Sequence, residues 1–149
     1  TGTNLLTYHN DWRHMGLSLY WDFIDKLFQI DANFGFTAAV LEMLVYSNED
    51  MIKILPALPD KWKKGKLTGA LTRCAVEVLI HWDVTTGKLR VELLPRVAGK
   101  VTVKFPGKLK TISSNLDVGN MIKSELGNEY KIFHTKKNEK IIIDCEIQF

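Results

Sequence analysis

The chain has 149 residues, of which 46% are hydrophobic and 25% are charged. This composition is typical of a folded globular protein with one sizeable core, or with one domain and part of a second. The net charge of +3 is too small to indicate a nucleic-acid partner. No run of about eighteen apolar residues occurs, so no membrane-spanning helix is expected. The chain starts at Thr1 without a basic and apolar leader, so we see no signal peptide and expect a fragment of a longer protein.

Charge changes sign along the chain. Residues 1–55 carry three basic and seven acidic groups, whereas residues 56–149 carry seventeen basic and ten acidic groups. The pattern of apolar residues changes at the same place, so we predict a domain junction between Leu55 and Pro56. The lysines of the second part are scattered along apparent strands, which favours solvated strand faces over a polyanion site.

The first part is predicted to be helical. Apolar residues recur at helical spacing over residues 12–28, and a second helix is expected over residues 36–47. This second segment is apolar on nearly every side, so it must be covered on nearly every side. One neighbouring helix cannot do that, and the simplest explanation is that residues 1–55 belong to a larger all-helical layer.

From Met51 onward the apolar period becomes two, as in β-strands. Residues 76–82 and 89–93 alternate around a turn at residues 85–88 and form the clearest hairpin. Further strands are expected at residues 52–55, 101–105, 130–133 and 141–149, and residues 110–128 have only a weak pattern. Trp62, in a proline-braced turn, is expected to anchor that turn. Short antiparallel strands in this number predict a small β-sandwich over residues 56–149.

The segment FQIDANFG at residues 28–35 is the main candidate for chemistry. We predict a loop in which Asp31 and Asn33 lie among bulky apolar residues. Two interpretations remain open. The two side chains are either catalytic polar groups, or caps that accept backbone N–H bonds before the next helix, with Gly35 relieving a tight turn. Burial of an unpartnered carboxylate is costly, which argues against a purely local role.

Other candidate sites are weaker. His9, Asp11 and His14 lack the spacing of a helical ligand pair, so no metal site or cofactor is predicted. Trp12 is a candidate for stacking on a sugar ring, although a buried tryptophan at a helix start explains it equally well. Cys74 and Cys145 lie far apart in strand-like runs, where free buried cysteine is the usual state. His81 and His134 are expected at the surface.

Two motifs together resemble glycoside hydrolase family 95. FQIDANFG, followed by TAA at residues 37–39 and EML at residues 42–44, is similar to the FQID-[GA]-N-[FM]-G…EML signature of this family of α-L-fucosidases. ILPALP at residues 54–59, with Trp62, Gly65 and Gly69, resembles the LLPALP…W…G…G junction of the family. RCAVEVLIHW at residues 73–82 resembles its RGGFEVDIxW strand, with Cys74 and Ala75 in place of two glycines. The resemblance covers roughly residues 4–95.

The resemblance implies an α+β chain: the end of a catalytic (α/α)6 barrel over residues 1–55, followed by a C-terminal antiparallel β-sandwich over residues 56–149. It also implies an inverting hydrolysis of α-1,2-linked fucosides in the intact parent. In the family a glutamic acid protonates the leaving oxygen, and asparagines held by an aspartate activate the water. Asp31 matches that aspartate by position, while Asn33, Phe34 and Trp12 are expected near the substrate.

The acid glutamate belongs to family segments that precede this chain, and Glu42 lies in the wrong motif to replace it. We therefore expect this chain to be inactive alone, with the remainder of the barrel and a fucosylated oligosaccharide as partners, and no nucleic acid, membrane or cofactor. The resemblance also implies that the intact parent is secreted or located in the cell envelope, as is usual in the family. Two alternatives stay open: a non-catalytic sandwich that binds glycan or braces the catalytic domain, and a parent that has lost activity.

Overall fold

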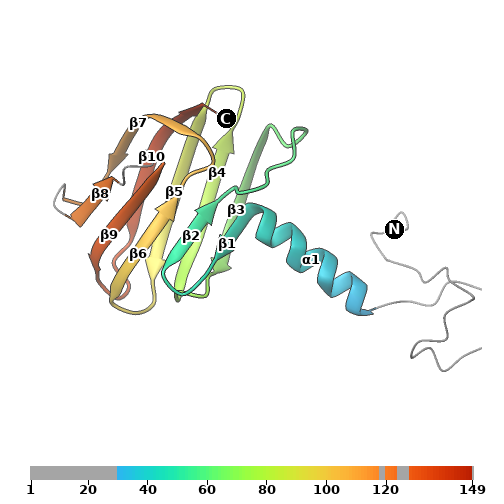
Figure 1. Cartoon of the computed structure of the whole chain (residues 1–149), viewed down its shortest axis with the longest axis horizontal. Coiled ribbons are helices and arrows are strands. Elements are labelled where there is room, and N and C mark those ends of the chain that lie inside the picture. The colour runs from blue at the N-terminus through green and yellow to red at the C-terminus, as the bar shows by residue number, and fades with distance from the viewer. Residues whose placement is uncertain (1–29, 118–119, 124–127, 149) are drawn as a thin grey trace, which may run out of the picture. The chain divides into compact units, whose positions relative to one another are not determined.

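The computed structural model describes residues 30–117, 120–123 and 128–148. This part of the chain contains one helix followed by ten strands (Figure 1). In chain order the elements are α1 (Ile30–Leu44), β1 (Val45–Ser47), β2 (Met51–Ile54), β3 (Lys64–Leu71), β4 (Val76–Asp83), β5 (Lys88–Pro95), β6 (Gly99–Lys104), β7 (Lys108–Ser114), β8 (Met121–Lys123), β9 (Glu129–Thr135) and β10 (Ile141–Gln148).

The strands form two five-stranded sheets, with the orders β1-β2-β6-β9-β8 and β3-β4-β5-β10-β7. All neighbouring strands are antiparallel except β2 and β6, which are parallel. Figure 1 shows the sheets as two layers, with β2, β6 and β9 in front of β4, β5 and β10. One buried cluster contains residues of both layers, so the described residues have the architecture of a β-sandwich. They contain a single helix, and the helical barrel therefore stays a prediction.

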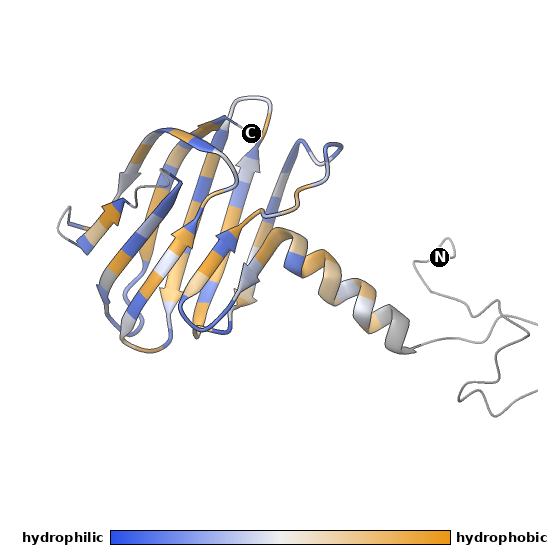
Figure 2. Cartoon of the chain, viewed as in Figure 1, coloured by the Kyte–Doolittle hydropathy of each residue, from blue (hydrophilic) through white to orange (hydrophobic). Residues whose placement is uncertain are grey.

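The core follows from the alternation of side chains along each strand (Figure 2). In β4 every second residue is buried, and the buried set is Val76, Val78, Ile80 and Trp82, with at most 4% of any of them exposed. Glu77 and His81 lie on the opposite face, as predicted. Because a one-residue shift would turn the whole apolar set to water, this alternation fixes the register of the strand.

The predicted hairpin of β4 and β5 is confirmed. Its pairing runs from Val76 opposite Pro95 to Asp83 opposite Lys88. Gly87, in the turn, has a φ of 70°. A side chain there would meet the carbonyl oxygen of Ile147, because a Cβ atom would lie 2.7 Å from it. The turn therefore needs glycine for both its backbone conformation and its contact with β10.

Helix α1 differs from the prediction at both ends. It begins at Ile30, so the loop predicted for residues 28–35 is wrong from residue 30 onward, and Gly35 lies inside the helix without a positive φ. It ends at Leu44 instead of Ser47, because Val45 and Tyr46 continue as strand β1 and pair with β2. β-branched and aromatic residues favour this extended conformation. The turn after β1 is closed by Asn48 Oδ1, which accepts the backbone N–H of Met51 at 2.7 Å.

Most of β7 and all of β8 lie within the weakly patterned residues 110–128. Both are edge strands, since each lies at the end of its sheet. β7 has no fully buried residue and carries lysine, threonine and serine side chains. Edge strands with polar side chains are a common way of discouraging pairing with other chains. They also lack the clear alternation that reveals a central strand.

The sandwich lies in a compact unit that extends from Leu41 to Phe149, and a separate unit covers Thr1–Val40. Strands β1 and β2 belong to one of the two sheets, although they precede the junction that we predict at Leu55 and Pro56. The compact unit therefore starts earlier than the predicted sandwich. No helix in the described ranges is both long and apolar enough to cross a membrane.

The turn before β3 is held by the backbone of Trp62 instead of its ring. The indole N–H of Trp82 donates to the carbonyl oxygen of Trp62 at 2.9 Å, and the side chain of Trp62 is 39% exposed. Gly65 lies directly opposite Trp82, and any Cβ atom there would overlap the indole ring. The tryptophan that anchors this turn is thus the one in β4.

Candidate functional site

The motif that carries Asp31 and Asn33 forms the first turns of α1. Both residues have helical backbone, directly after the start of the helix at Ile30. Their side chains lie outside the described part of the structure, as do all of Trp12, His9, Asp11 and His14. Phe34 is 68% exposed. The assignment of Asp31, Asn33, Phe34 and Trp12 to one pocket therefore remains a prediction.

The other end of α1 is fixed by the backbone of the LPALP segment. The N–H of Leu55 donates to the carbonyl oxygen of Leu44 at 2.8 Å, and the N–H of Ala57 donates to that of Met43 at 3.1 Å. The last carbonyl groups of a helix have no partner within the helix, so these bonds act as a C-terminal cap. Leu55 reaches them with a φ of 49°, which is unusual for a residue other than glycine, and its side chain is 2% exposed.

Arg73 adds a second set of contacts at the same end of the helix. Its backbone N–H donates to Ser47 Oγ at 3.0 Å, and its Nη1 donates to the carbonyl oxygen of Ser47 at 3.0 Å. Its Nη2 pairs with Glu42 Oε1 in the last turns of α1 at 3.1 Å. One guanidinium group thereby joins α1, the end of β1 and the loop between β3 and β4. Its planar arrangement of donors suits such a bridge better than a lysine would.

The ring of Tyr46 lies close to two cations. Lys53 Nζ is 5.1 Å from the ring centroid, and the guanidinium carbon of Arg73 is 5.9 Å from it. Both distances fall within the range of cation–π attraction, which is about 6 Å. Tyr46 is thus a further residue that contacts the Arg73 side chain, besides Ser47 and Glu42.

The loop that carries Arg73 is closed by Thr72. Its Oγ1 donates to the carbonyl oxygen of Val76 at 2.7 Å and accepts the backbone N–H of Val76 at 3.1 Å. Ala75 has a φ of 56° in this loop. It occupies the second position of the Gly-Gly pair in the family motif, and the left-handed conformation gives a physical reason for glycine there. Cys74 is a free, half-buried cysteine, and Cys145 is free and buried.

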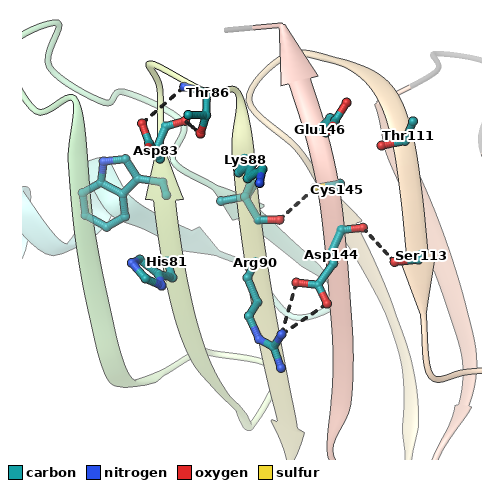
Figure 3. A pocket seen from close by; sticks show the side chains of 12 residues that line it. His81, Asp83, Thr86, Lys88, Arg90, Thr111, Ser113, Asp144, Cys145 and Glu146 are labelled. Atoms are coloured by element: carbon teal, nitrogen blue, oxygen red, sulfur yellow. Dashed lines mark hydrogen bonds and ion pairs between the residues drawn. The ribbon is translucent and has the colours of Figure 1, made fainter.

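A polar hollow of about 490 Å³ lies on the outer face of the sheet β3-β4-β5-β10-β7 (Figure 3). Most of its lining side chains come from two rows that cross the strands β4, β5, β10 and β7 in register. The first row is His81, Arg90, Asp144 and Ser113, and the second is Asp83, Lys88, Glu146 and Thr111. The first row has Arg90 next to Asp144, and the second has Lys88 between Asp83 and Glu146, so acidic and basic groups are mixed and the hollow has no strong net charge.

Ion pairs occupy part of this face. Arg90 Nη1 lies 3.3 Å from Asp144 Oδ2, and Arg90 Nε lies 3.2 Å from Glu92 Oε1. A bond from Lys140, at 2.9 Å, is the main reason that the pKa of Glu92 lies below its ordinary value. The pKa of Asp83 is also lowered, first by a hydrogen bond from Thr85 and then by one from Lys64. A general acid needs a raised pKa, so neither carboxyl group is suited to that role.

The hollow still offers groups for a polar ligand. Within the described part of the chain, the side chains of Lys88, Glu146, His81 and Thr111 have no hydrogen-bond or ion-pair partner. The Trp82 ring is 4% exposed, so it offers no stacking surface for a sugar. The buried Cys145 thiol has its pKa raised to about 12, by burial first and by Asp144 second, so it stays neutral. Among the described residues, no group of three His, Cys, Asp or Glu side chains is arranged to hold a metal ion.

Sequence reasoning missed both the bridge made by Arg73 and the polar hollow. Arg73 contacts residues 26 and 31 positions away in the chain, and no local pattern reveals such pairs. The alternation in the sequence did predict that the polar residues of these strands face outward. Their assembly into two rows depends on β10 pairing with both β5 and β7, which the alternation does not predict.

Two curated proteins match parts of this chain. "Alpha-L-fucosidase 2" of Arabidopsis thaliana is 57% identical over 56 residues, which are 37% of this chain and 7% of that protein. "Probable alpha-fucosidase A" of Aspergillus oryzae is 40% identical over 80 residues, which are 46% of this chain and 11% of that protein. The chain therefore matches only a small part of either relative.

A family model matches a longer stretch. Residues 46–143 match the model described as glycoside hydrolase family 95, C-terminal domain. This range starts in β1, ends in β10 and includes the strands between them, so it coincides closely with the two sheets. It also extends the family likeness well beyond residue 95, where the recognisable motifs end. The chain belongs to glycoside hydrolase family 95, and its sandwich is the C-terminal domain of that family.

Proposed function

We propose that this chain is the C-terminal portion of an inverting α-L-fucosidase that acts on α-1,2-linked fucosides. The observation that carries the proposal is the FQIDANFG motif, which lies just upstream of the family's C-terminal domain. The printed names of both relatives, an alpha-L-fucosidase and a probable alpha-fucosidase, support the same substrate class. The portion described here supplies one wall of the active site and not the whole site.

Asp31 is the proposed catalytic-site carboxylate. Its negative charge polarises a carboxamide whose oxygen accepts the proton of the attacking water, and it stabilises positive charge in an oxocarbenium-like transition state. Asn33 positions the substrate, and the exposed Phe34 contacts it together with Trp12. An inverting site needs a general acid on the opposite face of the sugar, with room for a water between the two groups. We assign that acid to the upstream part of the barrel.

The experiment compares this chain with a full-length protein that contains it. The 149-residue chain is expected to release no fucose, whereas the full-length protein releases β-L-fucose first from an α-1,2-fucoside, as NMR of the anomeric proton would show. In the full-length protein, Asp31→Asn is expected to lower kcat by about 10²–10³-fold, the usual effect of removing one group that stabilises the transition state. Glu49→Gln, at an exposed carboxylate, is the matched control and should leave kcat unchanged.

Fucose release by the 149-residue chain alone would disprove the claim that it holds only part of the site. Full activity of the Asp31→Asn variant would disprove the role of Asp31. An inactive full-length protein would indicate that this family member has lost its activity.

A second candidate function is glycan binding by the sandwich itself. It is favoured by the polar hollow, where Lys88 offers a donor and Glu146 an acceptor on one face, and neither has a side-chain partner among the residues that the structure describes. Titration of the chain with a fucosylated oligosaccharide, followed by NMR, distinguishes the two roles. Saturable shifts at Lys88 and Glu146 would support binding, and no shifts would favour a sandwich that braces the catalytic domain.

A further inference from the structure

Two chain segments at one end of the sandwich carry much of its positive charge. Residues 96–100 lead from β5 into β6, and residues 134–140 lead from β9 to β10 (Figure 1). Asn138 N–H donates to the carbonyl oxygen of Pro95 at 2.8 Å, and Thr135 Oγ1 donates to that of Gly99 at 3.0 Å, so the segments lie side by side. We call them the basic end. Their only acidic residue is Glu139, and their lysine and arginine residues are Arg96, Lys100, Lys136, Lys137 and Lys140.

A hollow of about 630 Å³ is lined by residues of both segments. Its lining consists of Ala98, Gly99, Lys100, His134, Thr135 and Lys136, so it contains basic side chains and no carboxylate. Among the residues that the structure describes, Lys100 and His134 have no hydrogen-bond or ion-pair partner for their side chains. The hollow therefore presents two basic groups that are available to a ligand.

A β-bulge brings His134 to this hollow. Gly99 lies opposite Thr135 and Val101 lies opposite Ile132, so two residues of β9 face the single residue Lys100 of β6. His134, in the bulge, has a φ of 57° and is exposed. A residue other than glycine adopts this conformation at a cost in free energy, and bulges often redirect a side chain next to a functional site. The irregular backbone thus coincides with the cluster of basic groups.

The carboxylates near the basic end leave part of its charge uncompensated. Three of its cations have an acidic partner, and these pairs are Arg96 with Glu77, Lys136 with Glu139 and Lys140 with Glu92. Within the described ranges, Lys100 and Lys137 have none. Glu49 and Asp50 precede β2, which lies on the side of β6 away from β9, and neither of them pairs with Lys100. The unpaired positive charge therefore lies on the β9 side of β6.

The composition of the basic end indicates what kind of anion it fits. A lysine ammonium group and an imidazole N–H both donate to carboxylate or sulfate oxygens. Neither segment contains Phe, Tyr or Trp, so the bases of a single-stranded nucleic acid would find no stacking surface there. The chain belongs to a family of glycoside hydrolases, so a glycan is the polyanion that fits its family.

We propose that the basic end binds an acidic polysaccharide, with a carboxylate or sulfate group in the hollow between Lys100 and His134. This role goes beyond the proposed function, because it concerns the sandwich alone and does not require hydrolysis of a fucoside. It also differs from glycan binding at the polar hollow, which lies on the outer face of the other sheet and has mixed charge.

The test measures binding of the 149-residue chain to three polymers at low ionic strength by isothermal titration calorimetry. Polygalacturonate carries carboxylates, dextran sulfate carries sulfates, and dextran is uncharged. We expect binding to at least one charged polymer and none to dextran, and the two charged polymers distinguish carboxylate from sulfate. About 1 M salt should abolish binding, because it screens exposed charges within about 3 Å.

A double variant tests the residues. Lys100→Gln with His134→Asn removes both available basic groups and should weaken binding about tenfold, since one exposed ion pair contributes a factor of up to about five. Asparagine at position 134 tolerates the left-handed backbone, so the bulge is kept. Lys100→Gln alone changes only an exposed side chain of β6, should weaken binding about threefold, and provides the test if the double variant does not fold.

The matched control is Lys66→Gln with Lys110→Gln. Both lysines are exposed, lie on the edge strands β3 and β7 of the other sheet and do not line the polar hollow. Their side chains also have no partner in the described part of the chain. This control removes two positive charges away from the basic end and should leave the affinity within about twofold of wild type.

Four outcomes would overturn the proposal. They are equal weakening by the two double variants, binding to dextran as tight as to polygalacturonate, no binding to either charged polymer, and tighter binding to single-stranded DNA than to both of them. The last outcome would assign the basic end to nucleic acid instead. None of these measurements uses fucose release, so a failure of the proposed function would leave their result unchanged.

Discussion

Helix α1 and strand β4 are both rich in apolar residues, yet their burial is opposite. In β4, Val78 and Ile80 are completely buried, because the second sheet covers one face of the strand. In α1, Phe34 is 68% exposed and Phe36 is 45% exposed. The apolar face of the strand is covered by other residues in the described part of the chain, whereas these two side chains of the helix are not. An exposed apolar surface of this kind is typical of a contact site, and under the proposed function the remainder of the barrel would cover it.

The largest expected effect tests this contrast directly. Ile80→Ala should destabilise the chain by about 3 kcal/mol, because it removes a completely buried side chain and leaves a cavity in the core. Phe34→Ala removes a larger side chain, yet it should change stability by less than about 0.5 kcal/mol, as expected of an exposed position. Urea unfolding of the two variants measures both values. A loss of similar size in the two variants would show that α1 is covered within this chain.

A smaller effect is expected at the loop that carries Arg73. Ala75→Gly should stabilise the chain by about 1 kcal/mol, because Ala75 has a φ of 56° and glycine adopts that conformation without steric strain. A gain of this size would show that the loop between β3 and β4 is strained at Ala75, in contrast to the regular strands beside it. The midpoint of urea unfolding measures it.

The control for this substitution is Ala70→Gly. Ala70 lies in strand β3 and has no positive φ, so glycine should destabilise the chain there by about 0.5 kcal/mol. An equal effect of the two substitutions would contradict the role assigned to the backbone conformation of Ala75.

The smallest effect depends on pH and concerns the outer face of the sandwich. Lys140 and Arg90 hold the pKa of Glu92 below its ordinary value, so the unfolded chain binds more protons at acidic pH than the folded chain. The stability that Glu92 contributes is therefore fully present above its unfolded pKa, about 4.5, and is lost as pH falls through the lower folded value. Glu92→Gln should weaken the loss of stability between about pH 5 and pH 3. Unfolding midpoints across this range test the prediction, and a variant with the same pH dependence as wild type would refute it.

Glu146→Gln, on the same face but without an ion-pair partner in the described part of the chain, is the control.

The sequence predicted the central strands more accurately than the edges and the helix. Alternation in residues 76–95 gave the hairpin and the buried face of β4, because central strands with one buried face require that pattern. The edge strands β7 and β8 were missed, since their polar side chains carry little alternation. The start of α1 was placed six residues late, because Asp31, Asn33 and Gly35 are typical of loops and are nevertheless helical here. The role proposed for Asp31 comes from the family motif and not from any pattern of spacing.

By itself, the sequence determined which residues must be buried, and it identified the family from two short motifs. These properties are local, since each depends on side chains within about ten positions of one another. The tertiary structure alone decided that β10 lies between β5 and β7 and that Arg73 reaches Glu42 and Ser47. Contacts between residues 26 to 54 positions apart depend on how the sheets assemble, because only the folded chain brings such distant segments within bonding distance. The junction at the end of α1 is a product of that assembly.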